Sequence, residues 1–162
     1  MKASWQKQVL ACSGYLELGM LDDAANALEE IQPDDKSRKE VLYAQVGLYA
    51  ASKKWKMAAV VAGHLVKAEP ANAGAWINLA YLVRRAENVQ EAETVLFKAR
   101  DWHPKNALIA FNLACYASVA GRMEEAKVRL LHAIDLDKDI RRLALDDKDL
   151  RPLWDWIGGV TS

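Results

Sequence analysis

The sequence contains few of the residues that interrupt helices or favour strands. Its 162 residues include 4 prolines, 8 glycines and 2 threonines, against 27 alanines. Alanine is the strongest helix former, whereas proline and glycine disfavour helix interiors and threonine is enriched in strands. The composition therefore predicts an all-α protein.

An excess of one charge and long apolar runs are also missing. Lys plus Arg is 22 and Asp plus Glu is 22, so the formal net charge is zero. The sequence has no bulk positive charge that would attract nucleic acid or an anionic membrane. The longest apolar stretch, residues 41–51, is interrupted by Gln45 and is shorter than the roughly 18 residues that cross a bilayer. We expect neither nucleic acid nor a membrane as a partner.

Cysteine is scarce as well. Cys12 and Cys115 lie far apart in the sequence, and neither belongs to a Cys-x-x-Cys pair or stands beside histidine at metal-ligand spacing. This usage is typical of a reduced protein, which predicts a cytoplasmic location. We expect both thiols to remain unpaired and no metal to be bound.

A repeat of 34 residues organises the chain. It is clearest in four equally spaced alanines, Ala24, Ala58, Ala92 and Ala126. Pro70 and Pro104 keep the same interval, as do Asn72 and Asn106, each of which is predicted to cap the next helix. Because a repeat decides the whole fold, the chain is interpreted as four units, residues 5–38, 39–72, 73–106 and 107–140.

Each unit is predicted to be a helical hairpin, because two apolar helical stripes flank a short break. The breaks fall at Gly19, at Lys53 and Lys54, at Glu87 and Asn88, and at Gly121. Small or slim residues recur where the paired helices approach, namely Cys12, Val46, Ala80 and Ala114 on the first helix and the four spaced alanines on the second. Ser37 and Glu40 are predicted to form a capping box at the start of the second unit.

This pattern resembles the tetratricopeptide repeat family from Trp5 to about Ile140. The third unit matches the family's motif at Trp76, Leu79, Ala80, Ala92, Leu96, Ala99 and Pro104. Tyr15 and Gly19 in the first unit and Tyr49 in the second add to the match. The terminal units depart from it, with Gln8 and Ala110 where the family favours Trp, and Lys36 and Lys138 where it favours Pro. The resemblance implies a right-handed superhelical array of helical hairpins, an α-solenoid, forming a single domain over residues 1–162.

The tail, residues 141–159, is predicted to be a capping helix. Leu150, Leu153, Trp154 and Ile157 form one helical stripe after Asp149, which is the expected N-cap. Pro152 would be tolerated in the first turn, and Gly158 and Gly159 are expected to end the helix. Such a helix would cover the exposed apolar end of a repeat array.

No catalytic constellation is found in the sequence. His64 and His132 hold the same place in two units, which indicates a solvated outer face. No Ser, Cys or Thr has a histidine base placed by sequence, and there is no glycine-rich phosphate loop. We therefore expect no enzyme activity and no cofactor.

The resemblance implies that the first helices of the units line a concave groove for a peptide. One register there is apolar in every unit, at Val9, Tyr43, Ile77 and Phe111, and Asn78 and Asn112 lie beside it. Asparagine can hold a peptide backbone because its amide is both donor and acceptor, although asparagine is also common there without a ligand. The predicted groove residues are Val9, Tyr43, Ile77, Asn78, Tyr81, Arg84, Arg85, Phe111, Asn112 and Cys115.

Two function classes remain open at this point. The first is a non-catalytic adaptor or chaperone-like module that binds an apolar peptide segment, with Arg84 or Arg85 favouring an acidic side chain. The second is a self-assembling scaffold that uses its terminal faces, for which Trp5 and Trp156 are the candidate surface aromatics. Simple solvation is the alternative reading of both arginines.

Overall fold

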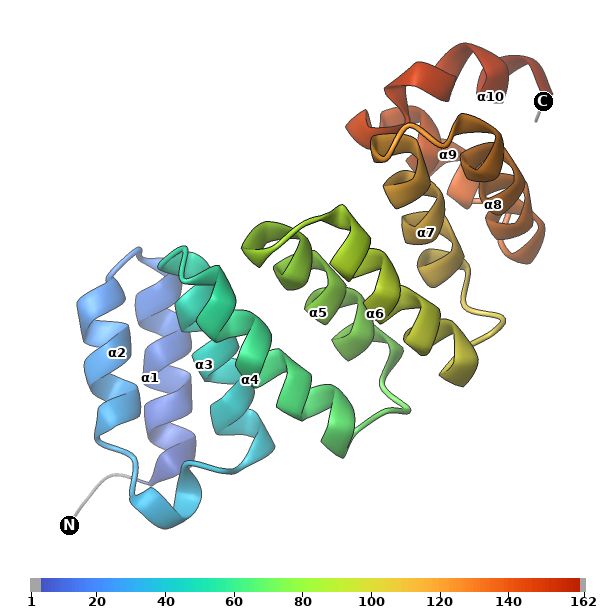
Figure 1. Ribbon diagram of the computed structural model, residues 1–162. Coiled ribbons are helices and arrows are strands. Elements are labelled where there is room, and N and C mark those ends of the chain that lie inside the picture. Colours follow the sequence, from blue (N-terminus) through green and yellow to red (C-terminus); the bar gives the residue numbers. More distant parts are fainter. Residues whose placement is uncertain (1–3, 161–162) are drawn as a thin grey trace. The chain divides into compact units, whose positions relative to one another are not determined.

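The computed structural model describes residues 4–160, and within that range the protein consists of helices and connecting turns, without strands (Figure 1). This confirms the prediction of an all-α protein. The elements are α1 (Trp5–Glu17), α2 (Leu21–Glu29), η1 (Pro33–Asp35), α3 (Lys39–Ala51), α4 (Trp55–Ala68), α5 (Ala73–Ala86), α6 (Val89–Trp102), α7 (Ala107–Val119), α8 (Met123–Leu136), α9 (Ile140–Asp146), η2 (Lys148–Leu153) and α10 (Trp154–Val160), where η marks a 3-10 helix.

The first eight α-helices form four hairpins in a constant register. The first helices begin at Trp5, Lys39, Ala73 and Ala107, where the predicted units also begin. The second helices begin at Leu21, Trp55, Val89 and Met123, again 34 residues apart. The helical hairpins expected from the repeat are therefore confirmed.

Small side chains occupy the contact between the two helices of each hairpin. Ala24, Ala58, Ala92 and Ala126 are all fully buried. On the first helices Cys12, Ala80 and Ala114 are also fully buried, and Val46 is nearly so. Side chains of this size allow helix axes to approach to about 8–10 Å, which explains why the alanine interval was the clearest repeat signal in the sequence.

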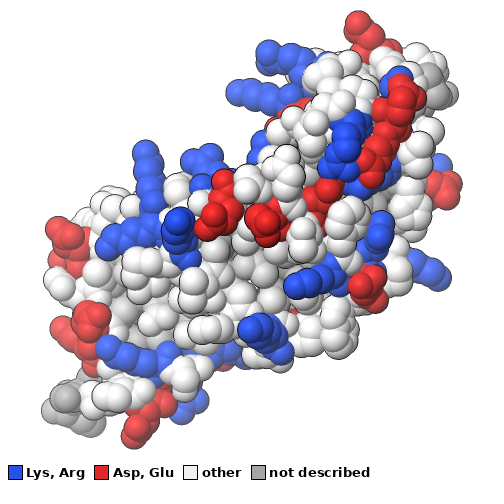
Figure 2. Space-filling model, viewed as in Figure 1, with Lys and Arg blue, Asp and Glu red and all other residues white. Residues whose placement is uncertain are grey.

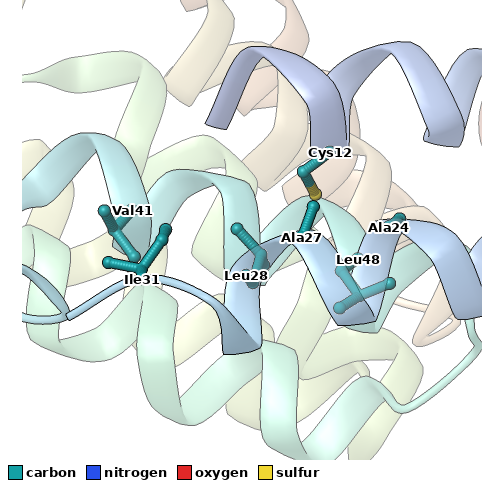
Figure 3. Packing of buried hydrophobic residues seen from close by; sticks show 7 residues of the cluster. All are labelled: Cys12, Ala24, Ala27, Leu28, Ile31, Val41 and Leu48. Carbon is teal, nitrogen blue, oxygen red and sulfur yellow. The ribbon is translucent and has the colours of Figure 1, made fainter. Parts of the chain in front are cut away.

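The chain divides into two compact units, residues up to Glu69 and residues from Pro70 onward. From here on these are called the first and the second unit, and each 34-residue repeat is called a hairpin. In the first unit, the side chains of α1, α2 and α3 share one core (Figure 3). Its buried members are Cys12, Ala24, Ala27, Leu28, Ile31, Val41 and Leu48. The core joins two consecutive hairpins, as expected of repeats that cannot bury their apolar faces alone.

Three hairpin turns contain a residue in the left-handed region. Gly19 and Gly121 have φ of 72° and 82°, which glycine adopts without steric cost. Lys53 holds the equivalent position in the second hairpin with φ of 58°. In the third hairpin Glu87 has φ of −124° instead, and the side chain of Asn88 caps α6 by accepting a hydrogen bond from the backbone N–H of Glu91 at 2.8 Å.

The predicted asparagine caps are present, but the predicted capping box is not. The side chains of Asn72 and Asn106 accept hydrogen bonds from the backbone N–H groups of Ala75 and Ile109, at 3.2 Å and 3.0 Å. Helix α3 instead begins after Arg38, without a side-chain cap. The segment before it forms η1, where Arg38 Nε donates to Asp35 Oδ1 at 2.5 Å, so the Ser37 prediction was wrong.

Two side chains of the second unit contact the backbone carbonyl oxygen of Pro70. Trp76 Nε1 donates to it at 2.9 Å, and His103 Nε2 lies at the same distance. His103 follows the last residue of α6, so its contact with the Pro70 carbonyl connects the end of α6 to the segment before α5.

A buried charge network joins α6 to α8. Glu93 is only 9% exposed, and its Oε2 accepts hydrogen bonds from Arg122 at 2.6 Å and from Arg129 at 2.8 Å. Burial alone would raise the pKa of Glu93, but the hydrogen bonds from Arg129 and Arg122 outweigh it and hold the pKa below its ordinary value. Glu125 also pairs with both arginines.

The tail differs from the single helix that the sequence predicted. It consists of α9, η2 and α10, and the N-cap of η2 is Asp147, whose side chain accepts from the backbone N–H of Asp149 at 2.9 Å. Pro152 has no N–H to donate, and it lies within η2. Gly158 and Gly159 lie inside α10, so the prediction that they end the helix was wrong. Of the predicted stripe, Leu150, Leu153 and Ile157 are buried and Trp154 is half-buried, but the stripe is divided between η2 and α10 rather than lying on one helix.

Candidate functional site

A cleft lies along the first helices of the second unit. It has a volume of about 630 Å³, within the usual range for ligand pockets. Its walls come from α5, from α7 and from the segment that enters η2. The lining residues are Gly74, Ile77, Asn78, Tyr81, Arg84, Arg85, Asn112, Tyr116, Asp147 and Asp149.

Six of the ten predicted groove residues line this cleft together, namely Ile77, Asn78, Tyr81, Arg84, Arg85 and Asn112. Tyr81 is 49% exposed and Ile77 is half-buried, which leaves apolar surface available on the wall. Gly74, one turn before Asn78, adds no side chain there. The cleft therefore combines accessible apolar groups with polar ones.

Two amides occupy the same register on α5 and α7. Asn78 is exposed. Asn112 Nδ2 donates to the backbone carbonyl of Leu108 at 2.9 Å, which orients the amide and leaves its carbonyl oxygen to accept from another donor. A peptide backbone presents N–H and C=O groups of the kind that such amides bind.

Arg84 is partly buried and held by a carboxylate. Its Nη1 and Nη2 donate to the two carboxylate oxygens of Asp149 at 2.6 Å and 3.0 Å, a bidentate geometry that is stronger than a single contact. The hydrogen bond from Arg84 to Asp149 raises the pKa of the arginine. The guanidinium also lies over the Tyr116 ring, 5.5 Å from its centroid.

The same aspartate is anchored a second time, through its backbone. Ser118 Oγ on α7 donates to the Asp149 carbonyl oxygen at 2.6 Å. Arg84 and Ser118 thus attach η2 to both α5 and α7. Asp149 acts as an internal partner of Arg84, a role that the sequence did not indicate because the two residues are 65 positions apart.

Phe111 and Cys115 do not offer their side chains at the surface. They are 7% and 1% exposed, respectively, in the stretch of α7 from Ile109 to Ser118 that is buried almost throughout. Helix α7 is packed by α8 on one side and also contacts α9 and η2. Phe111 and Cys115 were predicted to line the groove, but in this structure both are core residues.

In the first unit the two remaining groove residues have different surroundings. Val9 is partly buried against the core cluster of that unit. Tyr43 is 36% exposed, and its hydroxyl donates to Glu69 Oε2 at 3.3 Å. Glu69 also accepts from Lys39 Nζ at 3.0 Å. The hydrogen bond from Lys39 is the main reason that the pKa of Glu69 is lowered.

The buried thiol of Cys115, beside the cleft, is not an activated nucleophile. Burial raises the pKa of Cys115 well above its ordinary value, so the thiolate, which is the nucleophile and metal ligand, is disfavoured. Its sulfur and carboxylate oxygens of Asp147 and Asp149 lie within 4.8 Å of one another. Asp149 is already bound by Arg84, so this group does not form a ready metal site. Burial likewise raises the pKa of Tyr116 to about 12, which keeps its phenol neutral.

The exposed aromatics differ from those that the sequence favoured. Trp5 and Trp156 are half-buried, with the cations of Arg38 and Lys127 over their rings at 5.0 Å and 5.6 Å. Trp102 is 58% exposed, a finding that the sequence analysis missed. Its position at the last turn before a His-Pro pair was the available signal. His64 and His132 are not buried, in keeping with the predicted outer face.

Charges of both signs are mixed on the surface. Figure 2 shows lysine and arginine side chains interspersed with aspartate and glutamate on the viewed face, without a continuous basic stripe there. In the described part of the chain no helix is both long and apolar enough to cross a bilayer.

No protein-family model matches the sequence, and no curated protein is detectably similar to it. Among solved structures, a thermophilic TPR protein in Thermus thermophilus is similar, with a TM-score of 0.64 at 18% sequence identity. The similarity covers 96% of this chain and 84% of that chain. Together with the 34-residue register of the hairpins, this comparison shows that the chain has the fold of a tetratricopeptide repeat protein.

Proposed function

We propose that this protein is a non-catalytic adaptor or chaperone-like module that binds a peptide segment of another protein in the cleft along α5 and α7. Proteins with this repeat fold generally bind protein partners. The observation that carries the proposal is the cleft itself, where Ile77 and Tyr81 stand beside the amides of Asn78 and Asn112. We further propose a cytoplasmic location, in line with the two unpaired cysteines.

The bound segment is proposed to be apolar with an acidic side chain. Ile77 and Tyr81 supply apolar contact, and Asn78 and Asn112 bind backbone groups. The acidic contact is proposed to be made by the guanidinium of Arg85, which lies on the cleft wall. Val9 and Tyr43 hold the same apolar register in the first unit, and their contribution is tested separately.

The experiment selects ligands from a random-peptide phage library on the immobilised protein and titrates a selected peptide by calorimetry. Ile77→Ala combined with Tyr81→Ala is expected to abolish binding, because apolar anchors supply most of the affinity at such interfaces. Asn78→Ala should cost about 1 kcal/mol or more, since a backbone group of the peptide loses its partner. Tyr43→Ala tests the first unit.

Asn26→Ala is the matched control, because Asn26 is an exposed asparagine on α2, a second helix. It should leave affinity unchanged. Normal binding by the Ile77 and Tyr81 double variant, with its helical circular dichroism intact, would rule out the cleft as the binding site.

The scaffold alternative is less well supported at the N-terminal end. Val41 and Leu48 of α3 are buried against the preceding hairpin. The equivalent positions of α1 are Lys7 and Gly14, both exposed. A polar and a small residue at these positions suit a terminal face rather than one that stacks on another copy. Sedimentation at increasing concentration tests this, with a constant monomer mass expected.

A further inference from the structure

A second, smaller pocket opens on the second unit between α6, α7 and α8. It has a volume of about 200 Å³, and apolar atoms make up most of its lining. The lining residues are Arg100, Ala110, Leu113, Val128, Arg129 and His132. None of them lines the peptide cleft, so this pocket is separate from the proposed function.

Ala110 on α7 contributes its methyl group to the lining of the pocket. The equivalent residue of the preceding hairpin, 34 positions earlier, is Trp76, which is buried and donates from its indole to the Pro70 carbonyl. In the fourth hairpin this large side chain is replaced by a methyl group that lines the pocket with Leu113. The fourth hairpin therefore has a methyl group at the position where the third hairpin has an indole.

The mouth of the pocket is apolar on one side. Val128 lines it and is 68% exposed, and Leu131 on the same helix is 43% exposed. Exposed aliphatic residues beside a pocket with an apolar floor indicate a place for an apolar side chain from outside.

The polar part of the lining is positively charged or basic. Arg129 is satisfied by Glu93 and Glu125. Arg100 lies over the Phe97 ring at 5.0 Å, and within the part of the chain that the structure describes no carboxylate forms an ion pair with it or with His132. The pocket thus matches an apolar group flanked by negative charge.

We infer that this pocket receives an aromatic side chain from an acidic segment of a protein partner. The aromatic ring enters the pocket beside Ala110 and Leu113, and flanking carboxylates face Arg100 and His132. The occupant is a protein segment rather than a free aromatic acid, because the exposed aliphatic strip of α8 extends the contact beyond the pocket.

The test titrates three short peptides into the full-length protein and follows the NMR signals of Val128 and Leu131. The probe is acetyl-Glu-Glu-Trp-Glu-Glu-amide. One control replaces Trp by Ala, and the other replaces each Glu by Lys. The probe should bind saturably and about threefold to fivefold more tightly than the lysine peptide, which is the effect of one exposed ion pair. The alanine peptide should not bind.

Two variants connect the binding to the pocket. Ala110→Trp restores the side chain that the third hairpin already accommodates, and it should abolish binding of the probe. Arg100→Gln changes an exposed side chain, should leave the fold intact, and should reduce affinity for the probe to that of the lysine peptide. Asn26→Ala, at an exposed residue of α2 that lines neither pocket, should have no effect.

Equal affinity for the tryptophan and alanine peptides would overturn the inference. So would unchanged binding by a folded Ala110→Trp variant, or an Arg100→Gln variant that binds like wild type. Tighter binding of indole-3-acetate than of the acidic peptide would assign the pocket to a free aromatic acid, and would overturn the protein occupant.

Discussion

At the scale of single residues, position 53 has an unusual backbone. Lys53 adopts φ of 58° where the first and fourth hairpins have glycine. A side chain in the left-handed region costs roughly 1–2 kcal/mol, because Cβ approaches the carbonyl oxygen. The second hairpin therefore holds its turn against a steric cost that the packing of α3 and α4 offsets.

Lys53→Gly is expected to stabilise the protein by about 1 kcal/mol, because glycine relieves this cost. Chemical denaturation measures the change. Glu87→Gly is the matched control at the equivalent turn, where φ is −124° and glycine brings no relief. Equal gains from both substitutions would contradict the explanation.

Ala92 tests the helix contact inside a hairpin. It is fully buried where α6 meets α5, so Ala92→Leu should cost about 1–3 kcal/mol by overpacking. Ala120 is half-buried at the end of α7, and Ala120→Leu should cost less. The denaturation midpoints of the two variants measure this difference. Equal midpoints would count against the packing of α5 and α6 described above.

The lowered pKa of Glu93 predicts that the stability of the folded protein depends on pH. Its folded pKa is lowered, because the hydrogen bonds from Arg129 and Arg122 outweigh desolvation. A lowered carboxyl pKa contributes stability above the unfolded pKa, near 4.5, and that contribution is lost as pH falls through the folded pKa. Glu93→Gln should therefore be less stable than wild type at pH 7. The difference in free energy of unfolding between the two proteins should become smaller below about pH 4.5.

The control for this pH profile is Glu124→Gln, at an exposed glutamate paired with Lys127. Surface pairs of this kind contribute little, so its gap from wild type should be small at every pH. A Glu93→Gln gap that stays constant down to about pH 3 would show that the network does not depend on the charge of the carboxylate.

At the scale of elements, the α-helices of the hairpins followed from the sequence and the tail did not. Four hairpins could be placed because a 34-residue interval repeats small residues at each helix contact and Asn caps at two helix starts. In the tail no position recurs at a fixed interval, so its helices could not be placed in this way. Its course depends on long-range contacts. Arg84 and Ser118 bind Asp149 in the folded protein, whereas locally Asp149 was indistinguishable from a helix cap.

The candidate site was predictable to a similar degree. The register placed Ile77, Asn78, Tyr81 and Asn112 on one face of two helices, and the structure brings them to one cleft. The burial of Phe111 and Cys115 could not be predicted, because it depends on how α8, α9 and η2 pack on α7.

Attachment of η2 can be measured through Cys115. Asp149→Asn removes one charge from the bidentate pair with Arg84, and the thiol beside it should become accessible to a thiol reagent more often. We expect faster labelling of Cys115, while Cys12, buried in the core of the first unit, keeps its rate. Mass spectrometry of the labelled peptides separates the two. Equal labelling rates at Cys115 in both proteins would show that the pair does not hold the segment.

At the scale of the whole molecule, the described chain combines a repeated hairpin with two different pockets on its second unit. One is a cleft with amides and apolar groups along first helices, and the other is a small apolar pocket that Ala110 helps to line. Neither contains an activated nucleophile, since the thiol beside the cleft has a raised pKa. Both pockets are proposed above as sites that bind segments of other proteins.

The most direct test of the central proposal is to map where a selected peptide binds. Amide hydrogen exchange of the full-length protein, with and without the phage-selected peptide, reports each helix separately. The account predicts added protection on α5 and α7, around Asn78 and Asn112, and none on α6 or α8. Protection confined to α6 and α8, with α5 and α7 unchanged, would contradict it.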